Sequence, residues 1–243
     1  GESTVAELLG DRMARTRSPL VGTTASGNVV TVRVRAEQPG ADEANREAAA
    51  EAAAIATLLG PAAFAVLDRD TDLPDPLAHR VVAMLTERHE RLAAVESCTG
   101  GLLGALLTAV PGSSAAFWGG WQTYANQAKR SCVGVPAPMI EKQGAVSRQV
   151  AQAMAEGGLQ RADASRCLSI TGIAGPAGGS EAKPAGTVWI ALASADQPTH
   201  ARRFCFKGGR EAVREWAARS AMGMLRLGVE GLDMTLLGEQ ARF

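Results

Sequence analysis

The sequence has no excess of either charge and no long hydrophobic run. Its 243 residues carry 25 basic and 25 acidic side chains, so the formal net charge is zero. Proteins whose main partner is nucleic acid usually carry a basic excess, because they neutralise phosphates. No apolar run approaches the roughly 20 residues that a membrane-spanning helix needs. The composition therefore predicts a protein that binds neither nucleic acid nor a membrane.

Histidine, tyrosine and closely spaced cysteine are also scarce. The chain has three histidines, one tyrosine and four scattered cysteines. Neither the histidines nor the cysteines have the spacing of a metal site or of a disulfide framework. We therefore expect no metal and no cofactor. We also expect reduced thiols and a cytoplasmic protein, because no signal peptide is recognisable at the start of the sequence.

Hydrophobic residues, in contrast, make up 46% of the chain and occur in alternating helix-like and strand-like runs. Such alternation is typical of an α/β fold. Residues 68–76 are charged, contain proline and have no periodicity, so we place a domain boundary there. Residues 1–73 then form a small α/β domain. Its predicted elements are strands over residues 29–36 and 62–68 and an alanine-rich helix over residues 42–59.

The second domain, residues 74–230, centres on residues 94–101. A short apolar run ends there in the polar sequence ESCT, two glycines follow, and the next residues are helix-like. This order predicts a strand, a tight polar turn and a helix. Such a turn places N–H groups and hydroxyls at the positive end of a helix dipole, which suits a phosphate or an oxyanion. Ser97 or Thr99 could equally be a simple helix cap.

The rest of the second domain reads as further strands and helices. The strands near residues 92–96 and 167–173 are short, apolar and flanked by helices, so we expect them at the centre of the sheet. Residues 187–193 and 201–206 are predicted to form an antiparallel pair. Asp75 should cap a helix that begins at Pro76, and Ser147 should cap another. A glycine-rich loop follows the strand at residues 167–173, at the kind of strand end where α/β enzymes commonly bind ligands.

Seven short segments of the second domain together resemble one known family. They are AVESCTGG, VPGSSAAFWGG, TYANQAKRSCVGVP, GAVSRQVAQAMAEG, SITGIAGPAGG, KPAGTVWIALA and GGREAVRE. In this order and spacing they resemble the C-terminal domain of the CinA (competence/damage-inducible) family, which hydrolyses the amide of nicotinamide mononucleotide. The resemblance implies a three-layer α/β/α domain with a mixed sheet, a homodimer, and a place in pyridine nucleotide salvage and NAD metabolism.

Residues 1–73 resemble, more weakly, the small KH-like module of the same family. A KH domain that binds nucleic acid clamps the backbone with a GxxG loop. No basic GxxG loop occurs in this segment. We therefore expect a packing or dimerisation module there, and binding of nucleic acid is the disfavoured alternative.

The resemblance also implies a serine, a tyrosine and a lysine as the catalytic groups, and the matching positions are Ser114, Tyr124 and Lys129. A desolvated Lys129 with a lowered pKa could accept the proton of Ser114, and Tyr124 could relay it or protonate ammonia. Ser97 is the rival nucleophile and otherwise a substrate-binding residue. A cysteine amidase through Cys98 is disfavoured, because no histidine lies near it in the sequence. Each of these residues also has a purely structural interpretation as a turn, core-edge or surface residue.

The substrate, a small nucleotide, is expected to contact three further parts of the chain. These parts are the turn residues Thr99, Gly100 and Gly101, the strand-end residues Thr171, Gly172 and Ile173, and Arg210. The strand end would hold the nicotinamide or build an oxyanion hole, and the guanidinium of Arg210 would pair with the phosphate. Ala177 and Gly209 depart from the family pattern in loops near the substrate. These departures leave open a catalytically silent nucleotide-binding or regulatory module as the alternative function.

Overall fold

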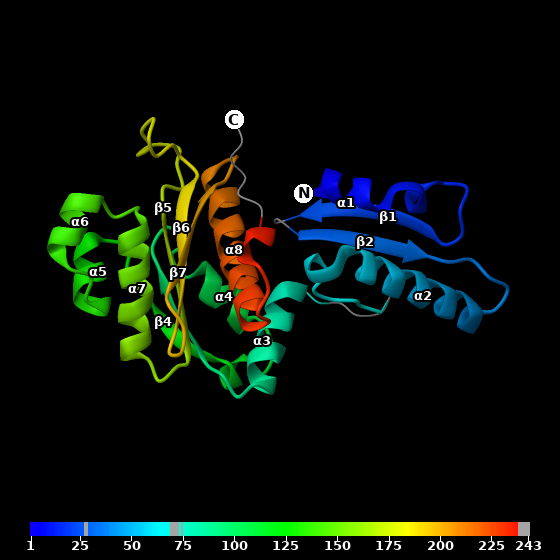
Figure 1. Cartoon of the computed structure of the whole chain (residues 1–243), viewed down its shortest axis with the longest axis horizontal. Coiled ribbons are helices and arrows are strands. Elements are labelled where there is room, and N and C mark those ends of the chain that lie inside the picture. The colour runs from blue at the N-terminus through cyan, green and yellow to red at the C-terminus, as the bar shows by residue number, and fades with distance from the viewer. Residues whose placement is uncertain (27–28, 69–72, 74, 238–243) are drawn as a thin grey trace. The chain divides into compact units, whose positions relative to one another are not determined.

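The computed structural model describes residues 1–26, 29–68, 73 and 75–237. Contacts divide the chain into two compact units, Gly1–Asp72 and Leu73–Phe243 (Figure 1). The elements of the first unit are α1 (Glu2–Leu9), η1 (Gly10–Met13), β1 (Leu20–Ser26), β2 (Val29–Arg35), α2 (Ala41–Leu59) and η2 (Gly60–Ala62), where η marks a short 3-10 helix.

The first unit is a two-stranded antiparallel sheet with helices packed against it. β1 and β2 pair along their whole length, so that Val21 lies opposite Val34. The buried side chains are Leu9, Val21 and Ile55, contributed by α1, β1 and α2. The predicted strand over residues 29–36 and the predicted alanine-rich helix are confirmed, because alternation and alanine content are strong local signals.

The strand predicted over residues 62–68 is wrong. η2 ends at Ala62, and residues 63–68 have no regular secondary structure. Val66 and Leu67 are 63% and 43% exposed, so this short apolar run does not form a buried face. A short apolar run without alternation cannot distinguish a strand from a loop, and three of these seven residues are alanines, which are depleted in strands.

The second unit is built on a five-stranded mixed sheet with the order β4-β3-β5-β6-β7. Its strands are β3 (Leu92–Glu96), β4 (Phe117–Gln122), β5 (Arg166–Gly172), β6 (Thr187–Ser194) and β7 (His200–Cys205). β3 is parallel to both β4 and β5, whereas β6 is antiparallel to β5 and to β7. The predicted central position of β3 and β5 and the predicted antiparallel pair β6–β7 are confirmed.

Helices cover both faces of this sheet, which confirms the three-layer α/β/α architecture (Figure 1). α7 packs on one face and is itself covered by α5 and α6, while α8 packs on the other face with α3 and α4. The helices are α3 (Pro76–Glu87), α4 (Leu102–Thr108), α5 (Asn126–Val133), α6 (Ala137–Gln143), α7 (Arg148–Arg161) and α8 (Arg210–Val229), with short helices η3 (Ser113–Ala115) and η4 (Met234–Leu236).

Two helix starts follow directly from the sequence. The Asp75 carboxylate accepts a hydrogen bond of 3.0 Å from the backbone N–H of Ala78, and Pro76 occupies the first turn of α3. The Ser147 hydroxyl accepts one of 3.4 Å from the N–H of Val150 at the start of α7. Both caps satisfy N–H groups that the helix itself leaves unpaired, so both predictions are confirmed.

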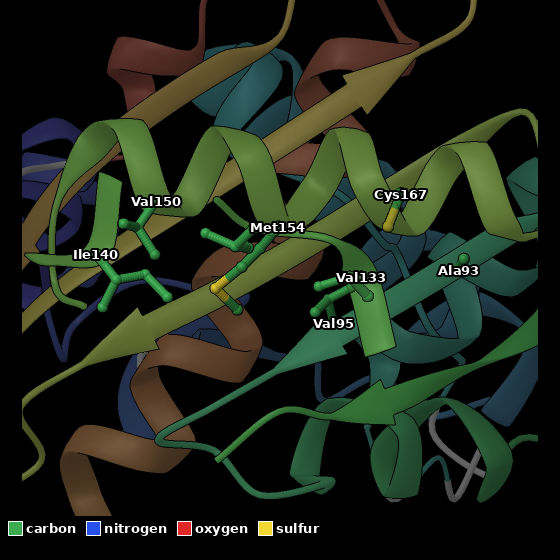
Figure 2. Close-up of a cluster of buried hydrophobic side chains, with 8 residues drawn as sticks. Ala93, Val95, Val133, Ile140, Val150, Met154 and Cys167 are labelled. Carbon is green, nitrogen blue, oxygen red and sulfur yellow. The ribbon is translucent and has the colours of Figure 1, made fainter. Parts of the chain in front are cut away.

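The core between α7 and the sheet depends on a close approach of the two layers. Figure 2 shows Val150 and Met154 of α7 pointing into a cluster with Val95 of β3. The helix can lie this close because Gly157 and Gly158 face its neighbours without side chains. A methyl group at Gly158 would collide with the side chains of Val95 and Cys167 in the sheet, and one at Gly157 would collide with the backbone carbonyl oxygen of Val133 at the end of α5.

We expect Gly157→Ala to lower the free energy of unfolding by about 2–4 kcal/mol, because the helix or the Val133 backbone must shift in a close-packed core. Urea unfolding followed by circular dichroism measures the effect. Gly209→Ala is the matched control, since nothing lies within 4 Å of the methyl group that it adds. Equal stability of the two variants would contradict the close approach of α7 to the end of α5.

Candidate active site

The topology brings three strand ends together at one edge of the sheet. β3, β4 and β5 are mutually parallel, so the residues that follow them lie on the same side, as at the ligand sites of other α/β folds. A pocket of about 170 Å³ lies there. The lining residues that matter for the chemistry are Ser97, Cys98, Tyr124, Lys129, Thr171 and Arg210.

Lys129 is the most unusual side chain of this pocket, because its ammonium group is buried and no described carboxylate pairs with it. The residue is only 1% exposed. Its Nζ donates to Ser97 Oγ at 2.9 Å, to the carbonyl oxygen of Thr123 at 2.8 Å and to that of Tyr124 at 3.2 Å. Burial disfavours the charged form and lowers the pKa of Lys129. The predicted shielding of this lysine from water is confirmed.

Ser114 does not join this site, and its predicted contact with Lys129 is wrong. It is exposed in η3, before the start of β4, whereas Lys129 follows the end of β4. Because β4 runs parallel to β3, Ser114 lies at the edge where β3 begins and Ser97 at the edge where it ends. Six residues of strand separate the two edges by roughly 15–20 Å. The serine that contacts the lysine is therefore Ser97, the rival candidate.

Tyr124 reaches the pocket in a different way from the one predicted. Its backbone carbonyl, not its hydroxyl, contacts Lys129, and its side chain is 62% exposed. The hydroxyl accepts a hydrogen bond of 3.0 Å from Arg210 Nη2, and Arg210 Nη1 donates to the carbonyl oxygen of Gly175 at 3.1 Å. Arg210 thus joins the tyrosine to the glycine-rich loop. Its other guanidinium N–H groups are available to a ligand in the pocket, which Arg210 lines.

The N-terminus of α4, expected to be free for a phosphate or an oxyanion, is filled by Glu96. This buried carboxylate accepts hydrogen bonds from the backbone N–H groups of Gly101 at 3.0 Å, Leu103 at 3.1 Å and Gly104 at 2.9 Å. A negative charge is favourable at a helix start, so the chain's own side chain takes the place predicted for a ligand. No sequence pattern indicated this cap, because a glutamate that precedes the turn does not have the spacing of a capping box.

The turn residues expected to bind substrate have structural roles instead. The N–H of Gly100 donates to the carbonyl oxygen of Ser97 at 3.1 Å, and the N–H of Gly101 is held by Glu96. Thr99 is fully buried, and its carbonyl oxygen accepts a hydrogen bond of 2.8 Å from Arg214. None of the three lines the pocket, so their predicted contacts with substrate are not supported. Both glycines have positive φ angles, of 61° and 97°, which explains their residue type.

The predicted strand-end residues divide into two groups. Thr171 and Gly172 line the pocket, and the Thr171 hydroxyl donates to the carbonyl oxygen of Ala145 at 2.9 Å. Ile173 does not line it, because its N–H and carbonyl pair with the backbone of Thr187 and Gly186. The pocket also takes in Asn126, Ala145, Val146 and Ala174, which we did not predict because the loops that carry them have no motif of their own.

A cysteine nucleophile and a metal centre find no support in this geometry. Burial raises the pKa of Cys98 to about 11, so its thiol stays protonated at neutral pH and is a poor nucleophile. Within the described ranges, no three histidine, cysteine, aspartate or glutamate residues cluster as metal ligands would. No described helix is long and apolar enough to cross a membrane.

Sequence comparison matches most of each unit to known proteins. Residues 74–228 match the CinA C-terminal domain, and residues 1–65 match the KH domain of damage-inducible protein CinA. A CinA-like protein of Anaeromyxobacter sp. (strain Fw109-5) is 46% identical over 78% of this chain and 44% of its own length. One of Frankia casuarinae is 39% identical over 99% of this chain and 55% of its own length. The chain thus spans about half the length of these curated relatives.

Solved structures agree with the sequence matches. The competence/damage-inducible protein CihA from Agrobacterium tumefaciens is 37% identical, with a TM-score of 0.63 over 66% of this chain and 99% of its own. A CinA superfamily protein from Klebsiella pneumoniae is 39% identical, with a TM-score of 0.62 over 64% of this chain and 96% of its own. The similarity therefore extends over nearly all of each of these solved chains.

We expect Glu96→Gln to lower the free energy of unfolding by about 2–3 kcal/mol. The glutamine amide has one acceptor oxygen instead of two, and its NH₂ group would face backbone N–H groups. Thermal and urea unfolding measure the loss. Glu141→Gln, on the exposed surface of α6, is the matched control and should change stability by less than about 0.5 kcal/mol. Equal stability of both variants would show that the carboxylate does not hold the turn.

Proposed function

This chain belongs to the CinA family, and on that premise we propose that it hydrolyses the carboxamide of nicotinamide mononucleotide to nicotinic acid mononucleotide and ammonia. The observation that carries the proposal is the 2.9 Å contact between Lys129 Nζ and Ser97 Oγ in a site shielded from water. Amide hydrolysis needs an activated nucleophile, and a serine activated by a desolvated lysine meets this need.

The neighbours of Lys129 orient it as a base. A neutral amine has two N–H groups and one lone pair. The carbonyl oxygens of Thr123 and Tyr124 can only accept hydrogen bonds, so they take the two N–H groups. The lone pair then faces Ser97, whose hydroxyl is the only one of the three partners that can donate. Lowering the pKa of Lys129 and aiming its lone pair at Ser97 are thus results of the same burial.

We propose two steps that use this pair. Lys129 accepts the Ser97 proton while Oγ attacks the amide carbon, and the lysine then gives that proton to the departing ammonia, which leaves an acyl ester on Ser97. A water molecule, deprotonated by the same lysine, hydrolyses the ester to the carboxylate and restores the serine. Each step leaves Lys129 in the protonation state that the next step needs.

Arg210 and Tyr124 are assigned to the substrate. Arg210 has N–H groups beyond the two that hold Gly175 and Tyr124, and a guanidinium binds phosphate well. Because the Tyr124 hydroxyl accepts from Arg210, it keeps its own hydrogen for donation to the substrate or to the departing ammonia. Both side chains line the same pocket as Ser97.

The departures at Ala177 and Gly209 leave the proposed chemistry intact. Both residues are exposed, and neither lines the pocket. The preserved Ser97–Lys129 pair therefore favours an enzyme over a catalytically silent module. From the family we also propose a cytoplasmic homodimer in pyridine nucleotide salvage, with no nucleic acid as partner.

We expect Ser97→Ala and Lys129→Ala to abolish the release of ammonia from nicotinamide mononucleotide. The first removes the nucleophile and the second its base. Ser114→Ala is the matched control, because this serine lies at the opposite edge of the sheet, and it should keep wild-type activity. A coupled assay for free ammonia with purified protein provides the measurement.

Two results would contradict the assignment. Loss of activity in Ser114→Ala with activity retained in Ser97→Ala would restore the first candidate nucleophile. A wild-type protein that binds the nucleotide, as measured by calorimetry, but releases no ammonia would support the silent module.

The pH dependence of kcat/KM should report the pKa of Lys129. Only the neutral amine accepts a proton, so the rate should rise with pH through the pKa of Lys129 in the folded protein and then level off. Because burial lowers this pKa, the rise should end below the ordinary pKa of a lysine. Lys129→Arg should be inactive at every pH, since a guanidinium stays protonated. A rate that falls as pH rises from 6 to 9 would rule out this base.

A further inference from the structure

A second pocket, of about 300 Å³, lies beside the proposed active site and has no role in the proposed reaction. It shares no lining residue with the first pocket. Its lining includes Arg148 at the start of α7, Lys183 in the glycine-rich loop, Trp189 of β6 and Arg203 of β7. Arg148 is thus brought by the fold beside three residues that follow it by 35 to 55 positions in the sequence.

The sheet register explains how the two pockets are neighbours. Thr171, Trp189 and Arg203 lie directly opposite one another on β5, β6 and β7, and therefore share one face of the sheet. Adjacent strands are about 4.8 Å apart, so these three neighbouring residues extend from Thr171 in the active-site pocket to Trp189 and Arg203 in the second pocket. The link between α6 and α7 separates them. Residues 145 and 146 of this link line the active site, whereas residues 143 and 147 line the second pocket.

The second pocket has a strong positive charge that no lining residue offsets. Arg148, Lys183 and Arg203 are cationic, and none of its lining residues is acidic. Lys183 Nζ donates to the carbonyl oxygen of Gln143 at 3.0 Å, and Arg203 Nη2 donates to that of Ala182 at 3.1 Å. Both cations are thus positioned by neutral acceptors, which orient them but do not neutralise their charge.

Other cations of the same unit show the contrast. Arg80 contacts Glu230 at 2.7 Å, Arg91 contacts Asp163 at 2.8 Å, and Arg166 is paired with Glu90. Each of these three arginines is thus paired with a carboxylate, unlike the cations of the second pocket. Three uncompensated cations around one hollow are suited to a ligand that brings several negative charges, because charge-assisted hydrogen bonds to phosphate are strong.

Trp189 adds an aromatic surface to this charge. The indole is partly buried against the small alanine cluster between α7 and the sheet, and it also lines the pocket. A rigid aromatic ring beside phosphate-binding cations is the combination with which proteins hold nucleotides, because any base can stack on it. The volume of the pocket falls at the lower end of the range of small-molecule sites.

We propose that this pocket binds a nucleoside diphosphate or triphosphate, with the phosphates on Arg148, Lys183 and Arg203 and the base on Trp189. This ligand is separate from the substrate of the proposed reaction. Its site touches the link that also forms one wall of the active-site pocket.

The test is calorimetric titration of the full chain with ADP, inorganic pyrophosphate and adenosine. ADP should bind once per chain, pyrophosphate more weakly and adenosine weakest, and added salt should weaken ADP binding. Arg203→Glu and Arg148→Glu change exposed residues and should each weaken ADP binding about ten- to hundredfold. Arg88→Glu, the same charge change at the exposed residue that follows α3, is the matched control and should leave binding unchanged. Trp189→Phe should weaken ADP binding but not pyrophosphate binding.

Titration of Ser97→Ala with ADP in the presence of nicotinamide mononucleotide separates the two sites. ADP should bind with the same affinity, because the substrate occupies the other pocket. Displacement of ADP by the mononucleotide, equal ADP binding by Arg203→Glu and wild type, or no ADP binding at all would each overturn the proposal. These binding measurements do not depend on ammonia release, so they test the second pocket independently of the proposed reaction.

Discussion

The active-site end of the second unit depends on one buried lysine whose described hydrogen-bond partners are all neutral oxygens. An isolated ammonium in a low-dielectric interior is unfavourable by several kcal/mol, and the usual remedy is a carboxylate partner or loss of the proton. Within the part of the chain that the structure describes, no carboxylate contacts Lys129, and two of its three hydrogen-bond partners are backbone carbonyls. Such an arrangement requires that the backbone be placed accurately, because carbonyl groups cannot rotate to follow the amine.

The sheet supplies this accuracy. The N–H of Thr123 donates to the carbonyl oxygen of Glu96 at 2.7 Å, which extends the β3–β4 pairing one residue beyond the strands and fixes the start of the segment that surrounds Lys129. On the other side of the same residue, the Glu96 side chain holds the start of α4. Ser97 therefore lies between two anchored segments. The position of its hydroxyl follows from the hydrogen bonding of Glu96 as much as from its own contacts.

Sequence patterns predicted what depends on neighbours along the chain. The capped starts of α3 and α7, the apolar central strands and the alanine-rich helix all follow from local spacing, and all are present. The choice between Ser97 and Ser114 could not be made this way, because both precede Tyr124 and Lys129 in small polar turns. What separates them is that β4 runs parallel to β3, so that one serine lies at each edge of the sheet. The hydrogen bonds between Glu96 and the N-terminus of α4 could likewise not be predicted from the sequence, because they depend on how the turn folds back on the strand.

The start of α8 shows the same dependence of the site on tertiary contacts. A cation at the first position of a helix opposes the helix dipole, by about 0.3–1 kcal/mol. Arg210 nevertheless occupies that position, and it contacts Tyr124 and the glycine-rich loop. One turn later Arg214 reaches the carbonyl oxygen of Thr99. The same helix end thus holds the turn that carries Ser97, the tyrosine and the loop after β5. The unfavourable charge at this helix start is explained because Arg210 joins Tyr124 to the loop after β5.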